Sequence, residues 1–247
     1  MGAHSASALT RLSEFLNNGD DKGRYAPLIF YPKAATLLKH LEETLPSILR
    51  QYHKAHSLTD VPILVDHLRP MFQERGFADR FIWEAYDFPA KNIAAQISFY
   101  SGHLGVYAGK GDYARIQYSR HLNFCWQRFA LCKEMYHSIL DDDPAKRVTA
   151  IEDLQKLSEM LVSGATSHLE PFRPHETEQE AEILALETLF PLELRLAHKE
   201  QYDEGMITDH QLALRYRIPE EFARIGMYPH YLLRMVEFRE GTLIAIV

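Results

Sequence analysis

Three polar residues in one mostly apolar stretch have the types and spacing of a chemical site. Lys133, Glu134 and His137 lie within the run RFALCKEMYHSIL. On a helix, positions 133 and 137 project from one face, and Glu134 lies beside that face. A Glu-x-x-His pattern supplies zinc hydrolases with a metal ligand and a carboxylate that activates metal-bound water. The run therefore suggests hydrolytic chemistry, with Glu134 as the general base and His137 as a metal ligand.

A second segment carries carboxylates that would complete such a site. In ETEQEAEILALETLFP, residues 176–191, Glu178 and Glu182 are four apart and share one face of the predicted helix. Glu178 is the expected further metal ligand, and Glu182 would orient a ligand histidine from the second shell. Glu180 is the competing choice for the ligand, because spacing does not decide between the two.

Three segments, in this order, resemble motifs of the ImmA/IrrE metallopeptidases. RFALCKEMYH, residues 128–137, looks like the family's active-site helix, roughly R-F-T-L-A-H-E-L-G-H. Residues 178–191, EQEAEILALETLFP, are similar to E-x-E-A-(N/D)-x-F-A-x-x-L-L-M-P. LALRYRIP, residues 212–219, is similar to L-A-x-x-F-x-V-S. The resemblance covers about residues 60–230.

The resemblance implies an α+β, zincin-like domain over residues 61–247, with residues 1–60 as an N-terminal helical extension. The domain would hold a small antiparallel sheet, an active-site helix and a second ligand helix. Several members of the family cleave a helix-turn-helix repressor, so a protein partner such as a transcriptional regulator is implied. Carried over by position, Glu134 is the general base, and His137 and Glu178 are zinc ligands.

Lys133 stands where the family has its first zinc-binding histidine, and Glu182 stands where Asn or Asp is usual. An ammonium has no lone pair for a metal, and releasing its proton at pH 7 costs about 4–5 kcal/mol from a pKa of about 10.4. The expected outcome is that Lys133 pairs with Glu178, Glu134 or both. The ammonium would then replace the metal as the cation between the two helices.

Two functions remain open from the sequence. The first is a metal-free regulatory module that binds a protein or peptide without cutting it. The alternative is an active endopeptidase whose zinc is held by His137, Glu178 and a further histidine. Candidates for that histidine are His121, His168 and His175.

Hydrophobic periodicity predicts the elements that position these groups. Helices are expected at residues 1–15, 32–56, 61–75, 123–140, 144–162, 176–190, 209–216 and 219–225, with a break near Pro46. Strands are expected at residues 94–100, 104–108 and 114–118, and terminal strands at 231–238 and 242–247. Arg128 and Phe129 are expected to hold the helix of residues 123–140 against the sheet.

Composition narrows the compartment and the partners. The formal net charge of -7 argues against nonspecific binding to nucleic acid or to an anionic membrane. No basic-apolar leader and no membrane-length apolar stretch is seen. Cys125 and Cys132 are seven apart on one helix, about 10 Å, which is too far for a disulfide. Cys132 is expected in the core, and a reducing cytoplasm is the natural location.

Overall fold

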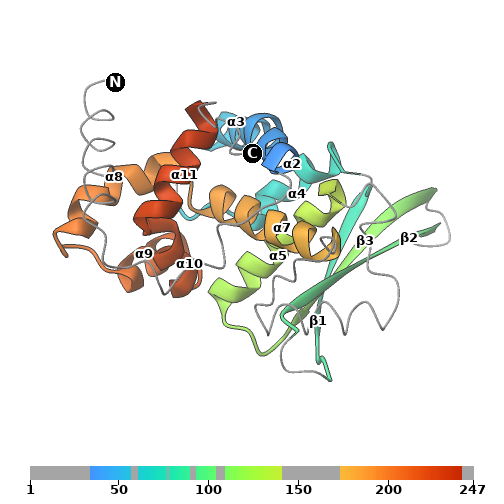
Figure 1. The fold of residues 1–247 in the computed structure, drawn as a ribbon. Helices are drawn as coiled ribbons and strands as arrows, with labels where there is room; N and C mark the ends of the chain where they lie inside the picture. Colours follow the sequence, from blue (N-terminus) through green and yellow to red (C-terminus); the bar gives the residue numbers. More distant parts are fainter. Residues whose placement is uncertain are drawn as a thin grey trace.

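The computed structural model describes residues 34–56, 61–76, 78–89, 93–103, 109–140 and 173–240. These residues form an α+β fold in which a group of helices lies beside a three-stranded sheet (Figure 1). The elements are, in order, α2 (Ala34–Lys39), the π-helix η2 (His40–Thr44), α3 (Leu45–Ala55), α4 (Val65–Gln73), β1 (Arg80–Tyr86), β2 (Ala95–His103), β3 (Lys110–Ser119), α5 (Phe124–Leu140), α7 (Arg173–Leu189), α8 (Leu192–Asp203), α9 (Asp209–Tyr216), α10 (Glu220–Met227) and α11 (Pro229–Glu240).

The sheet is mixed, which corrects the expectation of a wholly antiparallel one. Its strand order is β1-β3-β2: β2 runs antiparallel to β3 as expected, but β1 runs parallel to it. No strand was expected at β1, because its sequence, RFIWEAY, lacks strict alternation of apolar and polar residues. The strand expected at residues 104–108 lies outside the described residues.

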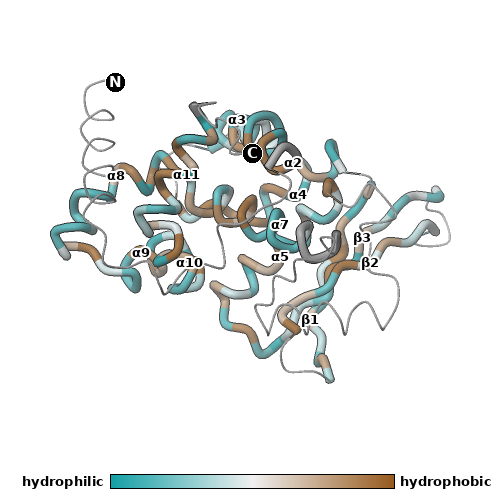
Figure 2. The backbone as a smooth tube through the Cα atoms, in the orientation of Figure 1, coloured by the Kyte–Doolittle hydropathy of each residue, from teal (hydrophilic) through white to brown (hydrophobic). Residues whose placement is uncertain are grey.

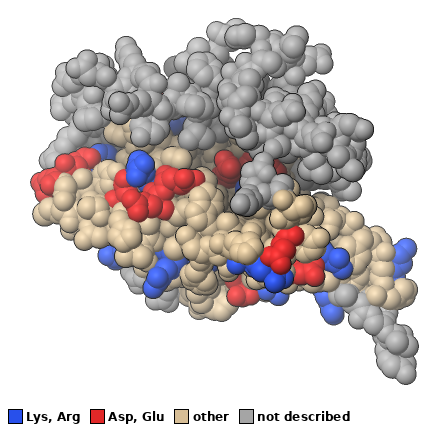
Figure 3. All heavy atoms as spheres, turned by 90° about the horizontal axis from the view of Figure 1, so that it is seen from below, with Lys and Arg blue, Asp and Glu red and all other residues tan. Residues whose placement is uncertain are grey.

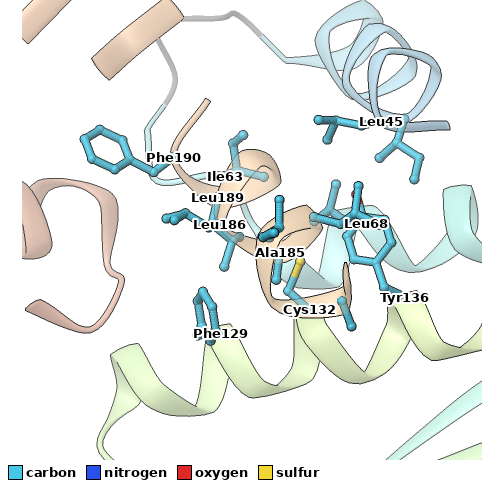
Figure 4. Packing of buried hydrophobic residues seen from close by; sticks show 14 of the residues in the cluster. Leu45, Ile63, Leu68, Phe129, Cys132, Tyr136, Ala185, Leu186, Leu189 and Phe190 are labelled. Atoms are coloured by element: carbon cyan, nitrogen blue, oxygen red, sulfur yellow. The ribbon is translucent and has the colours of Figure 1, made fainter. Parts of the chain in front are cut away.

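α5 and α7 are predicted correctly, and their contact is the centre of the helical part. Hydrophobic residues concentrate along α7 (Figure 2). Phe129, Cys132 and Tyr136 of α5 point toward Ala185 and its neighbours on α7 (Figure 4). Cys132 is fully buried, as expected, and burial raises the pKa of its thiol to about 12. A neutral thiol in this position packs as a small apolar group.

The predicted N-terminal helix is one run divided by a wider turn. α2 passes into η2 and then into α3, with Pro46 in the first turn of α3. Proline has no N–H for the carbonyl one turn earlier, and a π-helical turn is one way to accommodate such an interruption. Leu45 and Ile48 are buried in the same hydrophobic cluster as α5 and α7. The domain division at residue 60 stays a prediction.

The C-terminal part differs from the expectation. Residues 231–238, expected as a strand, belong to α11, and the preceding α8 was not expected at all. The buried residues of α11 include Leu232, Met235 and Val236, a helical spacing that a short apolar run does not distinguish from a strand. α9 and α10 confirm the helices expected at residues 209–216 and 219–225. The segments 1–15, 144–162 and 242–247 lie outside the described residues.

A buried ion pair links the C-terminal helices to α7. Arg195 of α8 is fully buried and pairs with Glu187 of α7, while its Nη1 donates to the carbonyl of Gly226, 3.0 Å away. The Tyr231 hydroxyl of α11 donates to the same Glu187 carboxylate at 3.1 Å. A Cβ on Gly226 would lie 3.2 Å from Arg195 Cδ, so glycine allows the close approach of α10.

We expect Tyr136→Phe to lower the free energy of unfolding by about 1–2 kcal/mol. The Thr188 hydroxyl donates to the Leu184 carbonyl at 2.7 Å, so Tyr136 is the donor to Thr188 Oγ1, 2.6 Å away. Urea unfolding measures the loss. Tyr118→Phe is the control, because the Tyr118 hydroxyl has no hydrogen bond within the described residues, and its change should stay within about 0.5 kcal/mol. Equal losses in the two variants would contradict this role for Tyr136.

Candidate functional site

The structure brings four of the predicted site residues together between α5 and α7. Lys133 Nζ lies 2.5 Å from Glu178 Oε2 and 3.2 Å from Glu134 Oε1. His137 Nε2 lies 3.2 Å from Glu178 Oε1. We refer to Lys133, Glu134, His137 and Glu178 as the Lys133 cluster. The ion pairs expected for Lys133 are confirmed, and Glu178 is the carboxylate that reaches both Lys133 and His137.

Local sequence explains why these side chains meet. Asn123 Oδ1 accepts a hydrogen bond from the Trp126 N–H at 3.0 Å, which caps the start of α5. From there, Lys133 and His137 fall four apart on the face beside the apolar one. On α7, Ala181 and Ala185 are fully buried, and such small side chains permit a close approach to α5. Glu178 lies at the charged end of this contact.

The cluster is largely withdrawn from water. Only 3% of the Glu134 side chain and 4% of the His137 side chain are exposed, against 18% for Lys133 and 20% for Glu178. Burial acts to lower the pKa of Lys133, but the charges of Glu134 and Glu178 outweigh it and hold the pKa well above its usual range. Burial acts to raise the pKa of Glu178, but Lys133 and His137 outweigh it and hold that pKa well below its usual range. Lys133 and Glu178 are therefore both charged at neutral pH.

Glu182 lies one turn further along α7, and the charges of Lys133, Glu178 and His137 all act on the pKa of its carboxyl. Burial is the main cause that raises the pKa of its carboxyl, and the neighbouring carboxylate of Glu178 adds to it. Lys133 and His137 act in the opposite direction. Its role as a second-shell residue stays a prediction. Glu180, the competing ligand, is a buried residue of the same helix.

These side chains do not fit a zinc ion. A catalytic zinc needs three protein ligands and an open position for water. Within the described residues, no group of three or more His, Cys, Asp or Glu side chains is placed to hold a metal ion. The ammonium of Lys133 instead lies against Glu178 and Glu134, where it would repel a dication.

None of the three histidines predicted as a further metal ligand is placed in the Lys133 cluster by the described residues. His121 is 80% exposed and its Nε2 lies 3.2 Å from Asp87 Oδ1, in the turn before α5. His168 lies outside the described residues, and the side chain of His175 does too.

Arg128 and Phe129 have a different role from the expected one. They were expected to hold α5 against the sheet, but Arg128 Nη2 donates to the Ile63 carbonyl at 2.7 Å, and its Nε donates to the Arg217 carbonyl at 3.0 Å. Phe129 stacks on Phe222 of α10, with ring centroids 3.7 Å apart. Both residues thus position α5 against the loop before α4 and against the C-terminal helices. An arginine inside an apolar helix was the available signal, but its partners are 65 and 89 residues away.

Comparison with known proteins gives no further guide. No family model matches this chain, and no curated protein or solved structure matches it. No helix of the described segments has the length and apolar character needed to cross a bilayer. Acidic and basic side chains are interspersed on the face shown in Figure 3. The ImmA/IrrE resemblance therefore remains a prediction from the motifs.

We expect Lys133→Met to lower the free energy of unfolding by about 3–5 kcal/mol, because the buried carboxylate of Glu134 and the largely buried carboxylate of Glu178 then lack their cation. Adding Glu178→Gln to this variant should restore part of the loss, since it removes one uncompensated charge. Urea unfolding of both variants and of the parent protein tests this. A double variant no more stable than Lys133→Met would contradict the coupling.

The same pair predicts a pH window for stability. The pKa of Glu178 is depressed in the folded state, so its contribution is present above the ordinary value of 4.5 and is lost as pH falls below it. The pKa of Lys133 is raised, so its contribution is present below the ordinary value of 10.5 and is lost as pH rises above it. Urea midpoints measured against pH should fall at both ends, and the Lys133→Met/Glu178→Gln variant should respond less at each.

Proposed function

We propose that this chain is a metal-free, zincin-like module that binds a segment of a protein partner without cleaving it. The observation that supports the proposal most strongly is the Lys133 ammonium, 2.5 Å from Glu178 Oε2 and 3.2 Å from Glu134 Oε1. In the zinc-peptidase pattern, a metal ion would join these carboxylate-bearing helices. Here a side chain of the protein supplies the cation.

The environment of Glu134 argues against hydrolysis. A general base in this position needs a water activated by a metal, and it needs a free lone pair directed at that water. Glu134 is 3% exposed, and one of its oxygens lies beside Lys133 Nζ. The alternative function, an active endopeptidase, would need the ammonium displaced and a third ligand from outside the described residues.

An open strand edge is the feature that supports peptide binding. Within the described residues, β2 pairs only with β3, and no strand of these residues lies along its other edge. The Ser119 N–H donates to the Ala94 carbonyl, and antiparallel alternation from this pair directs the backbone groups of Ile97 and Ser101 away from β3. An extended segment can add to such an edge through main-chain hydrogen bonds.

The partner class follows from the resemblance rather than from geometry. The partner is a transcriptional regulator, the class that the resemblance to the ImmA/IrrE motifs implies. Cys125 and Cys132 are free thiols, which suits a reducing compartment such as the cytoplasm.

Metal content separates the two functions. We expect protein purified without chelators to contain far less than stoichiometric zinc, because the ammonium occupies the place of the metal. Lys133→His should raise zinc uptake, and Lys133→Gln, which removes the ammonium without adding an imidazole, should not. Elemental analysis of the three proteins provides the measurement. Near-stoichiometric zinc in the parent protein would exclude the metal-free module.

Binding at the strand edge has its own test. Extended peptides selected from a display library should bind equally well with and without EDTA, and Glu134→Gln should bind and leave them intact just as the parent does. Ser101→Pro should weaken binding, because proline removes one outward N–H without removing a ladder hydrogen bond. Ser101→Ala is the matched control: both variants lose the Ser101 hydroxyl that donates to Asp112, but only proline removes the N–H. Equal binding by the two variants, or cleavage of the peptides by the parent protein, would overturn the proposal.

A further inference from the structure

A cavity of about 190 Å³ lies between the start of α4, β1 and the first half of α5. Its apolar wall includes Trp83 of β1 and Phe124 and Leu131 of α5. Leu64 and Phe124 are 43% and 61% exposed, so the cavity reaches the surface beside them. The cavity shares no lining residue with the Lys133 cluster.

Within the described residues, the wall of this cavity contains a buried cation whose charge no carboxylate balances. Arg128 is 5% exposed and lines the cavity. Its Nε and Nη2 donate to the Arg217 and Ile63 carbonyls, and Nη1 makes no hydrogen bond within the described residues. Among the described residues, no Asp or Glu forms an ion pair with Arg128. A guanidinium stays protonated at neutral pH, and a buried charge is costly unless it is paired.

The first turn of α4 lines the same cavity. Leu64 is the N-cap residue and gives no side-chain cap, and residues 64–67 all line the cavity. The Leu64 N–H donates to the Tyr52 hydroxyl and the His67 N–H to the Leu64 carbonyl, each at 3.0 Å, and the helix dipole adds a partial positive charge at this end. Asp66, in the same turn, is paired with Arg69 at 2.8 Å, so its charge is already balanced. Arg128 therefore dominates the electrostatics of the cavity.

We propose that this cavity binds a monocarboxylate that carries an apolar group about the size of one aromatic ring. The carboxylate would pair with Arg128 and the apolar group would lie among Trp83, Phe124 and Leu131. The cavity volume suits an apolar group of this size, since an apolar cavity of about 150 Å³ holds a benzene molecule. A phosphate dianion fits less well, because Arg128 is the one arginine or lysine among the described residues that line the cavity.

Such a carboxylate has two sources: a free aromatic or branched acid, or the C-terminus of a polypeptide that ends in an apolar residue. Both present the same charge and a similar apolar group. This inference does not depend on the proposed function, because it rests on other residues and on no metal.

Trp83 provides the readout, since the chain has only two tryptophans. In a Trp126→Phe background, all tryptophan fluorescence comes from the cavity wall. Titration with benzoate at pH 7 should give a saturable change in emission. Benzamide, which has the same shape and no charge, should bind at least roughly tenfold more weakly, because a charge-assisted hydrogen bond is lost. Equal binding of the two, or no saturable change with benzoate, overturns the proposal.

A matched pair of variants tests the charge without removing Arg128, whose loss would endanger the fold. Leu64→Asp and Leu64→Asn both place a good N-cap residue at the start of α4, and they differ only in charge. Leu64→Asp should weaken benzoate binding several-fold relative to Leu64→Asn and leave benzamide binding similar in the two. Equal benzoate affinity in the two variants overturns the proposal.

A final comparison distinguishes the two sources. N-acetylated tripeptides ending in phenylalanine are titrated as the free acid and as the amide. Binding of the acid at least as tight as that of benzoate, with the amide weaker, assigns the cavity to a polypeptide C-terminus. Binding of benzoate but not of the peptide acid assigns it to a free small acid.

Discussion

The interaction on which the arrangement depends is the placement of the Lys133 ammonium between two carboxylates, Glu134 on α5 and Glu178 on α7. Carboxylates this far from water are stable as anions only beside a cation or several donors. A metal ion would meet this need from outside the chain. The lysine meets it from within, so α5 and α7 can pack with no added group.

A second ion pair between a carboxylate of α7 and a cation of another helix lies near the other end of α7. Glu187 is 1% exposed and faces Arg195, which is fully buried on α8. Between the two ion pairs, the helix contacts α5 through the small residues Ala181 and Ala185, and Thr188, next to Glu187, accepts a hydrogen bond from Tyr136. A helix that carries buried carboxylates at both ends can occupy the core only because cations from two different helices meet them. Its position therefore specifies where α5 and α8 lie.

The sequence predicted the parts of the fold that depend on local pattern. α5 and α7 have long apolar runs that end at residues unfavourable to a helix. The positions of Lys133, His137, Glu178 and Glu182 on the helix faces followed from helical spacing. The mixed sheet was not predictable in this way, because β1 pairs with β3 in parallel across about 30 residues and lacks strict alternation. α11 was mistaken for a strand because a short apolar run fits both periods. The partners of Arg128 and Arg195 are backbone carbonyls and side chains brought together only by the tertiary fold, which no spacing reveals.

α5 thus carries two cations in unlike states, the largely buried Lys133 and the buried Arg128, five residues or about 7.5 Å apart along its axis. Lys133 is compensated by carboxylates of the protein itself, and its side chain is held in one place by them. Within the described residues, Arg128 donates to two carbonyls and lies over the Phe124 ring, 5.6 Å from its centroid, and these contacts hold its orientation but leave its net charge in place. A compensated cation stabilises the fold and has little attraction left for a ligand, whereas an uncompensated one in a cavity wall attracts an anion. The physical chemistry of this helix therefore distinguishes a structural position at Lys133 from a position at Arg128, five residues earlier, that can attract an anion.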